Sequence, residues 1–380
     1  MEKLLCIRLW LFTFSFHCFM ALTLALSGTN FTTDKFALLA LKSSITRDPY
    51  HFLTHNWSAS SSLCNWVGVT CDAHHGRVRI LNLGDMDLSG TIPSHVGNLT
   101  FLNKLDLGGN KFHGQLPEEL VHLRRLKFLN LSYNEFSGNV PSWIGGLSAL
   151  RYLYLGNNNF GGFIPKSISN LTRLEILAWN HNLIQGTIPP EVGKMTHLRV
   201  LSMAVNRLSG TIPRTISNLS SLQGISLSYN SLSGGIPSEM GEVPQLGIMY
   251  LGDNPLGGSI PSTIFNNSML QDIELGSSNL SGTLPSNLCH GLPNIQILYL
   301  GFNQFSGILP SVWNQCQVLT DIDLSQNKFS GGSIPDGIGN LPILNSIYLD
   351  EDNLEGIYMF SSYNFIKLIL LFYKYTGAHL

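Results

Sequence analysis

Few residues of this chain have the types and the spacing that catalysis or metal binding requires. His74 and His75 are adjacent, so they cannot form the pair of histidines, four residues apart on a helix, that binds zinc. No nucleophile motif or kinase motif frames the scattered serine, histidine and aspartate residues. The glycine-rich phrases lack the lysine and the following helix of a phosphate-binding loop. We therefore expect no enzyme, no metal site and no cofactor.

Charged and aromatic residues beside the recurring Leu-x-Leu phrases are better placed for binding than for catalysis. The charged ones are basic early and acidic late: Arg79, Lys104, Lys127, Arg151 and Arg199, against Asp106 and Glu175, and then Asp253, Asp272, Glu274, Asp321, Asp323, Asp350 and Glu351. Interleaved aromatic residues are Phe128, Tyr133, Tyr152, Tyr154, Tyr229, Tyr250, Tyr299, Phe302 and Tyr348. Tyrosine is a common binding anchor because it combines a large area with a polar tip.

These residues suggest a bipolar ligand face, with a basic segment of a peptide or protein partner over the later, acidic part. The candidate ligand-binding residues are Tyr152, Tyr154, Tyr250, Asp272, Glu274, Tyr299, Asp321 and Asp323. The alternative is a solvated surface with incidental charge. The formal net charge of −2 gives no reason to expect nucleic acid as a partner.

A repeat must position these residues. Between Arg79 and Gly356 the phrase LxLxxNxLxGxIP occurs twelve times, with a period of 24 residues except for two steps of 25. Such a period with this leucine pattern predicts a leucine-rich-repeat solenoid, an α/β architecture in which each repeat adds one strand to a parallel sheet. The asparagine of the phrase can satisfy backbone groups of adjacent coils, the glycine permits a positive φ, and the proline fixes an extended segment.

The segment before the repeats is expected to cap the open end of the solenoid. Residues Asp34 to Ile45 predict a short amphipathic helix that Asp34 can cap, and Trp57 and Trp66 can cover the exposed core.

Four cysteines remain when the two in the first 27 residues are set aside. In an oxidising compartment, bridges Cys64–Cys71 and Cys289–Cys316 are the natural pairing. Cys316 stands where other repeats carry an apolar residue, so a buried free thiol is the alternative for it.

Residues 1–27 are interpreted as a secretory signal, with Lys3 and Arg8 before an apolar run. The alternative is a signal anchor, because the run is long enough to approach a membrane span. Secretion agrees with eight Asn-x-Ser/Thr sequons, which are candidate glycosylation sites: Asn30, Asn56, Asn98, Asn130, Asn170, Asn218, Asn266 and Asn279.

Two stretches carry a family resemblance. The phrase NLSYNEFSGNVPSWIGGLS resembles the plant-specific class of leucine-rich repeat, and DKFALLALKSSI with the later CNWVGVTC resembles the N-terminal cap of plant leucine-rich-repeat receptor kinases. The phrase LPSNLCHGLPNIQILYLGFNQFSG resembles the immune pattern-recognition subgroup, including its bridge between repeats. The resemblance covers roughly residues 34–356. It implies a plant-type horseshoe or superhelix with its parallel sheet on the concave face and a disulfide-bonded N-terminal cap.

The resemblance also implies a cell-surface ectodomain for immune or developmental signalling. Such a module binds a peptide or protein on its concave or lateral face, with a leucine-rich-repeat co-receptor as a further partner. A secreted decoy or an apoplastic inhibitor without signalling activity is the alternative, and a structural apoplastic repeat protein is a third.

The expected organisation is a signal peptide (1–27), an N-terminal cap (28–78), twelve repeats (79–356) and a divergent apolar tail (357–380). Relatives of this type continue into a membrane helix and a kinase, and neither is recognisable here. The apolar core of the tail, Phe365 to Tyr375, is shorter than a membrane span and contains Lys367. Truncation of a receptor is the favoured interpretation, and a tail that covers the last coil is the alternative. The chain would then lie at the plasma membrane as part of a full receptor, or in the apoplast if complete.

Overall fold

The computed structural model describes residues 32–330, 334–349 and 352 of the chain. The expected signal segment 1–27, the sequon at Asn30, the acidic residues Asp350 and Glu351 and the tail 357–380 lie outside this part. The chain divides into two units, Met1–Phe136 and Ser137–Leu380.

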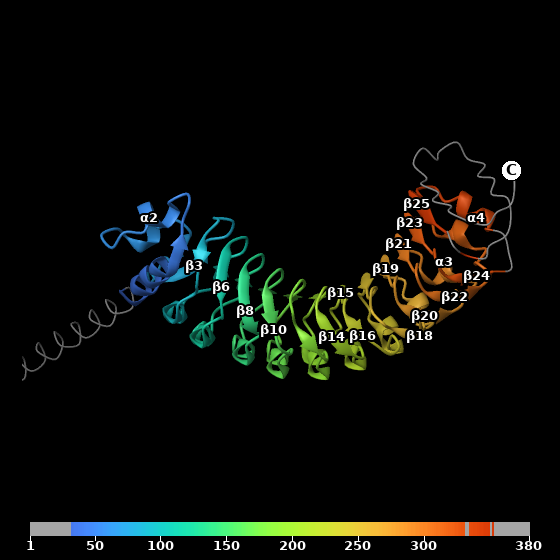
Figure 1. The fold of residues 1–380 in the computed structure, drawn as a ribbon, viewed down its shortest axis with the longest axis horizontal. Helices are drawn as coiled ribbons and strands as arrows, with labels where there is room; N and C mark the ends of the chain where they lie inside the picture. Colours follow the sequence, from blue (N-terminus) through green and yellow to red (C-terminus); the bar gives the residue numbers. More distant parts are fainter. Residues whose placement is uncertain (1–31, 331–333, 350–351, 353–380) are drawn as a thin grey trace, which may run out of the picture. The chain divides into compact units, whose positions relative to one another are not determined.

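The first unit begins with a helix at residues 32–44 and continues into the first coils (Figure 1). Its further elements are β1 (Ile45–Arg47), α2 (Phe52–Asn56), η1 (Leu63–Asn65), β2 (Val69–Cys71), β3 (Val78–Asn82), β4 (Ser89–Gly90), η2 (Ser94–Asn98), β5 (Lys104–Asp106), β6 (Lys111–Gly114), η3 (Glu118–His122) and β7 (Phe128–Asn130), and β8 (Glu135–Asn139) ends it and crosses its boundary. Strand β2 pairs antiparallel with β3, and the strands β3, β5 and β7 are parallel.

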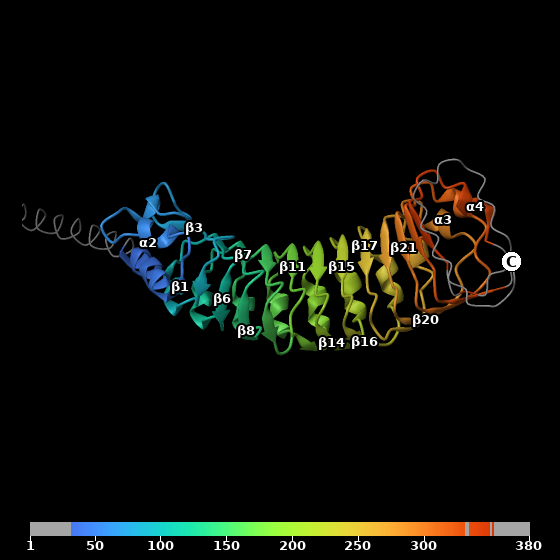
Figure 2. The same ribbon diagram turned by 45° about the horizontal axis from the view of Figure 1, so that its top comes forward.

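The second unit repeats one coil: a three-residue strand, a corner, a short second strand and a helical turn (Figure 2). The first strands are β9 (Tyr152–Tyr154), β11 (Ile176–Ala178), β13 (Val200–Ser202), β15 (Gly224–Ser226), β17 (Ile248–Tyr250), β19 (Asp272–Glu274), β21 (Ile297–Tyr299), β23 (Asp321–Asp323) and β25 (Ser346–Tyr348). They form parallel neighbours in that order, so residues of the same repeat position stand side by side.

The short second strands form smaller sheets on the other side of each corner. They are β10 (Asn159–Gly161), β12 (Gln185–Gly186), β14 (Arg207–Gly210), β16 (Ser231–Leu232), β18 (Gly257–Ser259), β20 (Asn279–Gly282), β22 (Gln304–Gly307) and β24 (Lys328–Phe329). The helical turns are η4 (Ser142–Gly146), η5 (Lys166–Asn170), η6 (Pro190–Lys194), η7 (Arg214–Asn218), η8 (Ser238–Glu242), η9 (Ile264–Asn266), α3 (Leu288–Gly291), η10 (Trp313–Gln315) and α4 (Asp336–Gly339). The predicted leucine-rich-repeat solenoid with parallel strands is confirmed.

The repeat asparagines form a ladder, as the sequence predicts. Asn254, only 2% exposed, donates from Nδ2 to the carbonyls of Leu227 (3.0 Å), Leu251 (2.9 Å) and Gly252 (3.1 Å). Its Oδ1 accepts the N–H of Leu232 at 3.0 Å. One amide thus satisfies buried backbone groups of two adjacent coils, which would otherwise destabilise the corner.

The residue before the ladder position is left-handed in every coil from Asp85 to Gln326, which the sequence analysis did not predict. Val205, Tyr229 and Phe302 have φ values of 56°, 57° and 56°. Asparagine and glycine tolerate this region, as at Asn157 (55°) and Gly109 (66°), whereas a β-branched valine is strained there.

The two tryptophans expected to cover the core are buried in the N-terminal cap, and they stack on each other, which was not predicted. Trp57 and Trp66 are 1% and 2% exposed, with ring centroids 5.3 Å apart. Their indole N–H groups donate to the Val67 carbonyl (3.0 Å) and to Ser61 Oγ (2.7 Å), so burial leaves neither unpaired.

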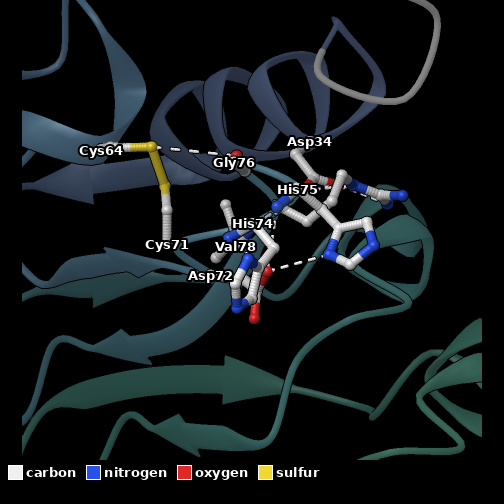
Figure 3. Close-up of a disulfide and its surroundings, with 9 residues drawn as sticks. Asp34, Cys64, Cys71, Asp72, His74, His75, Gly76 and Val78 are labelled. Atoms are coloured by element: carbon white, nitrogen blue, oxygen red, sulfur yellow. Dashed lines mark hydrogen bonds and ion pairs between the residues drawn. A yellow bond between two sulfur atoms is a disulfide. The ribbon is translucent and has the colours of Figure 1, made fainter. Parts of the chain in front are cut away.

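The expected capping role of Asp34 is wrong. This residue lies inside the helix at residues 32–44, and its buried carboxylate accepts two hydrogen bonds of 2.8 Å from the Arg77 guanidinium and one of 2.9 Å from the N–H of Val78 (Figure 3). The side chain therefore ties the helix to the start of β3. The partner was not predictable because Arg77 lies 43 residues later in the chain.

Candidate functional site

The candidate site lies on the strand face of the second unit, defined as the outward side chains of β9, β11, β13, β15, β17, β19, β21, β23 and β25. In each three-residue strand of this set the middle residue is buried and the first and third point outward, as in β21, where Leu298 is buried between Ile297 and Tyr299. Two rows of outward side chains therefore run across the strands.

From β17 each row alternates between two kinds of side chain, one row as far as β23, after which Ser346 follows, and the other as far as β25. Register pairing places Ile248 beside Asp272, Asp272 beside Ile297, and Ile297 beside Asp321. The other row is Tyr250, Glu274, Tyr299, Asp323 and Tyr348 in paired order. We call these two rows the acidic–aromatic face. Its acidic residues stand on every second strand, and neighbouring strands are about 4.8 Å apart.

The four carboxylates of this face, on Asp272, Glu274, Asp321 and Asp323, take part in no ion pair among the described residues. Asp272 Oδ2 accepts the Tyr250 hydroxyl at 3.1 Å, and Asp321 accepts the Ser346 hydroxyl. The carboxylates therefore meet neutral donors only. Such a face is negative and open to a cation.

Glu274 is the carboxylate most affected by its surroundings. Burial between the neighbouring strands raises its pKa above the usual value, and the negative charge of Asp253 raises it further. Burial also raises the pKa of Tyr250, to about 12, with the charge of Asp272 and its hydrogen bond to that carboxylate as further causes. Burial, followed by the charge of Asp321, raises the pKa of Tyr299. A bound cation would relieve the unfavourable charge at Glu274.

Two predicted residues, Tyr152 and Tyr154, do not belong to this group. They lie on β9, and β11, β13 and β15 separate them from β17. The Tyr152 hydroxyl donates to Glu175 at 3.1 Å, and Arg151 forms an ion pair with the same carboxylate. Burial raises the pKa of Glu175, but its bonds to Arg151 and Tyr152 outweigh this and hold the pKa below its usual value. The negative charge of Glu175 beside β9 is thus already neutralised by Arg151.

Four residues expected on the sheet lie elsewhere. The left-handed corners that follow the strands hold Tyr133, in the first unit, and Tyr229, Asp253 and Phe302, in the second. Conversely, Ile248 and Ile297 belong to the acidic–aromatic face but were not predicted, because only polar and aromatic residues were considered. Their equivalence to Asp272 and Asp321 in the repeat was the available signal.

Both predicted disulfides are present. Cys64 bonds Cys71, the last residue of β2 (Figure 3), with 5.5 Å between the Cα atoms, and Cys289 bonds Cys316 with 4.9 Å between them. The second pair joins α3 to the residue after η10, and both cysteines are buried. The alternative of a free thiol at Cys316 is therefore wrong.

The described sequons divide by their surroundings. Asn98, Asn170, Asn218 and Asn266 are exposed at the ends of η2, η5, η7 and η9, which is one repeat position. By contrast, Asn56 accepts the N–H of Val67, Asn130 donates to Asp106 Oδ1 (2.9 Å) from within β7, and Asn279 begins β20. Glycosylation of all of them stays a prediction.

The His74–His75 pair serves a turn. Asp72 Oδ1 accepts both backbone N–H groups at 3.0 Å and meets His75 Nδ1 at 2.9 Å (Figure 3). The bond to the His75 side chain, followed by the two backbone bonds, lowers the pKa of Asp72 to about 2. Within the described residues no group of three or more histidine, cysteine or acidic residues is placed to hold a metal ion. Nor does that part of the chain contain a helix with the length and apolarity to cross a membrane.

Family models match most of the chain. A leucine-rich repeat region is recognised over residues 137–373, a leucine-rich repeat N-terminal domain over 32–72, and single leucine-rich repeats over 101–123 and 125–147.

Individual proteins give the same picture. The chain is 39% identical over 112 residues to the "LRR receptor-like serine/threonine-protein kinase EFR" of Arabidopsis thaliana, a match that covers 28% of this chain and 11% of that protein. It is 32% identical to the ectodomain in the "Crystal structure of PEPR1-AtPEP1", with a TM-score of 0.74 over 85% of this chain and 49% of the other. For the "Plant peptide hormone receptor RGFR1 in complex with RGF2" the identity is 35% and the TM-score 0.70, over 72% and 43%. The chain spans less than half the length of these proteins. It belongs to the leucine-rich-repeat family and is similar to the ectodomains of plant receptor kinases.

Proposed function

We propose that this chain is an extracellular recognition module whose strand face binds a peptide or protein ligand, with a cationic segment of the ligand over β17 to β25. The observation that carries the proposal is the acidic–aromatic face. Its four carboxylates alternate with tyrosines and isoleucines in register and have no cationic partner among the described residues.

Physical chemistry favours a lysine or arginine side chain at this face. An ammonium or guanidinium group between Glu274 and the rings of Tyr250 and Tyr299 would gain charge-assisted hydrogen bonds and cation–π attraction. It would also offset the burial and the negative charge of Asp253, which together raise the pKa of Glu274. Ile248 and Ile297 would supply apolar contact for the stems of such side chains.

The similar solved structures support a peptide as the ligand. One of them is the "Plant peptide hormone receptor RGFR1 in complex with RGF2". This similarity supports the further proposal that the chain acts in the secretory pathway, at the cell surface or outside the cell, in immune or developmental signalling. A leucine-rich-repeat co-receptor is a further proposed partner.

The test compares binding of two short fluorescent peptides to the purified chain by fluorescence anisotropy. One alternates lysine with alanine, and the other alternates glutamine with alanine. The lysine peptide is expected to bind more tightly, with an affinity that falls as salt rises. The triple variant Asp272→Asn, Asp321→Asn, Asp323→Asn should lose about tenfold in affinity, equivalent to about 1.4 kcal/mol.

The matched control removes three carboxylates from the helical turns: Glu239→Gln, Glu242→Gln and Asp336→Asn. It changes the net charge equally, so its affinity should stay near that of the parent chain. Equal losses in the two variants would mean that only net charge attracts the peptide, and unchanged affinity at low salt in the first variant would refute the face as a binding site.

A further inference from the structure

The first unit carries a basic surface that the proposed peptide face does not use. It consists of Arg79, Phe101, Arg125 and Lys127, and we call it the arginine–phenylalanine array. Phe101 lies between two guanidinium groups: Arg77 Cζ is 4.5 Å from its ring centroid and Arg125 Cζ is 4.0 Å. Such distances are typical of stacked cation–π contacts.

Contacts with Arg77 and Asn103 hold the array in place. Arg77 is only 5% exposed and is fixed by its ion pair with Asp34, so it supports one face of the Phe101 ring. Asn103, oriented to satisfy both neighbours, donates to the Arg125 carbonyl at 2.9 Å and accepts from Arg79 Nε at 2.9 Å. Arg79 and Arg125 are therefore ordered before any ligand arrives, which lowers the entropic cost of binding.

The three outer cations of the array lack the carboxylate partners that other cations of this unit have. Lys104 pairs with Asp106, and both Arg47 and Lys111 pair with Asp87. Arg79, Arg125 and Lys127 are exposed and form no ion pair with any residue that the structure describes. Three cations gathered in this way repel one another, and an anion placed over them would remove that repulsion.

From this we infer that the arginine–phenylalanine array is a second binding site, one that takes an acidic segment of a peptide or protein. A guanidinium over an aromatic ring still has N–H groups to donate, and these match a carboxylate in bidentate geometry. The site rests on the proposed function only in that the chain recognises polypeptides.

The test uses the full chain with Asn98→Gln in every sample, so that a glycan three residues before Phe101 cannot obstruct the array. The probe is a short fluorescent peptide of alternating glutamate and alanine, measured by anisotropy. The triple variant Arg79→Gln, Arg125→Gln, Lys127→Gln should weaken binding about tenfold. Phe101→Leu, which keeps an apolar side chain but removes the ring, should weaken it less.

The matched control is Arg173→Gln, Lys194→Gln, Arg207→Gln, which removes three exposed cations from the second unit. Its affinity for the glutamate peptide should be unchanged. Equal losses in both triple variants, or no binding by the parent chain, would overturn the inference. Binding of an oligogalacturonate but not of the glutamate peptide would also overturn it, in favour of a polysaccharide.

A parallel measurement separates this inference from the proposed function. The lysine peptide should bind equally to the parent chain and to the array variant, because its site lies on the acidic–aromatic face. If the parent chain binds only the glutamate peptide, the inferred site at the array is supported and the proposed function is contradicted. If it binds only the lysine peptide, the proposed function is supported and the inferred site is contradicted.

Discussion

Replacing Asn254 by serine tests whether the asparagine ladder is what holds the coils of the second unit together. Serine is too short to reach both the Leu251 carbonyl and the Leu232 N–H, which the asparagine now satisfies, whereas the Leu227 carbonyl would keep the Asn230 amide as a donor. Each buried backbone group left without a partner costs about 1–3 kcal/mol, so the two together should lower the free energy of unfolding by about 2–6 kcal/mol. A serine occupies the equivalent repeat position 278 in the native sequence, and its Oγ donates one long hydrogen bond of 3.4 Å to the Gly276 carbonyl.

Urea denaturation followed by circular dichroism measures the global loss. Hydrogen exchange at the Leu232 amide measures the local one, because that N–H would lose its acceptor. Asn159→Ser, next to a ladder position but exposed, is the matched control and should change stability by less than about 0.5 kcal/mol. The reverse change, Ser278→Asn, should stabilise by about 1 kcal/mol. If Asn254→Ser costs no more than the control, or the Leu232 amide keeps its protection, the ladder does not carry the stability assigned to it.

Three further predictions concern strain, a disulfide and a titrating group. Val205→Asn should raise the free energy of unfolding by about 1 kcal/mol in urea denaturation, because asparagine tolerates the left-handed φ of 56° that strains valine; a loss of stability would contradict this. Replacing Cys289 and Cys316 together by serine should destabilise by about 3.5 kcal/mol from the loop entropy of a 27-residue separation, against about 2.4 kcal/mol for the Cys64 and Cys71 pair with its separation of 7. Glu274→Gln should raise the melting temperature at pH 7, because a carboxylate whose folded pKa is raised destabilises the fold when ionised. As the pH falls through that raised pKa towards the usual 4.5, the two melting curves should converge, and a constant difference across this range would show that charge is not the cause.

The repeat frame made the ladder and the strand face predictable. The role of Asn254 could be assigned because the asparagines at the equivalent position of the other repeats share one geometry. The register that sets Tyr250 beside Glu274 follows from the same period. The left-handed corners were missed because Val205 and Tyr229 are poor indicators of that conformation, although Gly109 and Asn157 at the same position were a clue.

Contacts outside the repeat frame could not be predicted. The bond of Asp34 to Arg77 depends on how the cap meets the first coils, and no periodic signal in the sequence encodes it. By contrast, Phe101 and Arg125 lie one period of 24 residues apart, so the repeat itself sets Arg125 over Phe101. The cap tryptophans were predictable only because an uncovered apolar end requires large apolar residues.

The alternation of acidic and aromatic or aliphatic residues from β17 onward has a period of two coils, whereas the fold itself has a period of one. Gaining or losing a single repeat between β17 and β23 would leave the solenoid intact. For a ligand anchored on the earlier coils, however, every coil beyond the gained or lost repeat would present an apolar residue where an acidic one stood, and an acidic residue where an apolar one stood. A gain or loss of two repeats would preserve the phase. Recombination that adds or removes an odd number of repeats would therefore change which ligand this surface recognises. An even number would only lengthen or shorten the surface.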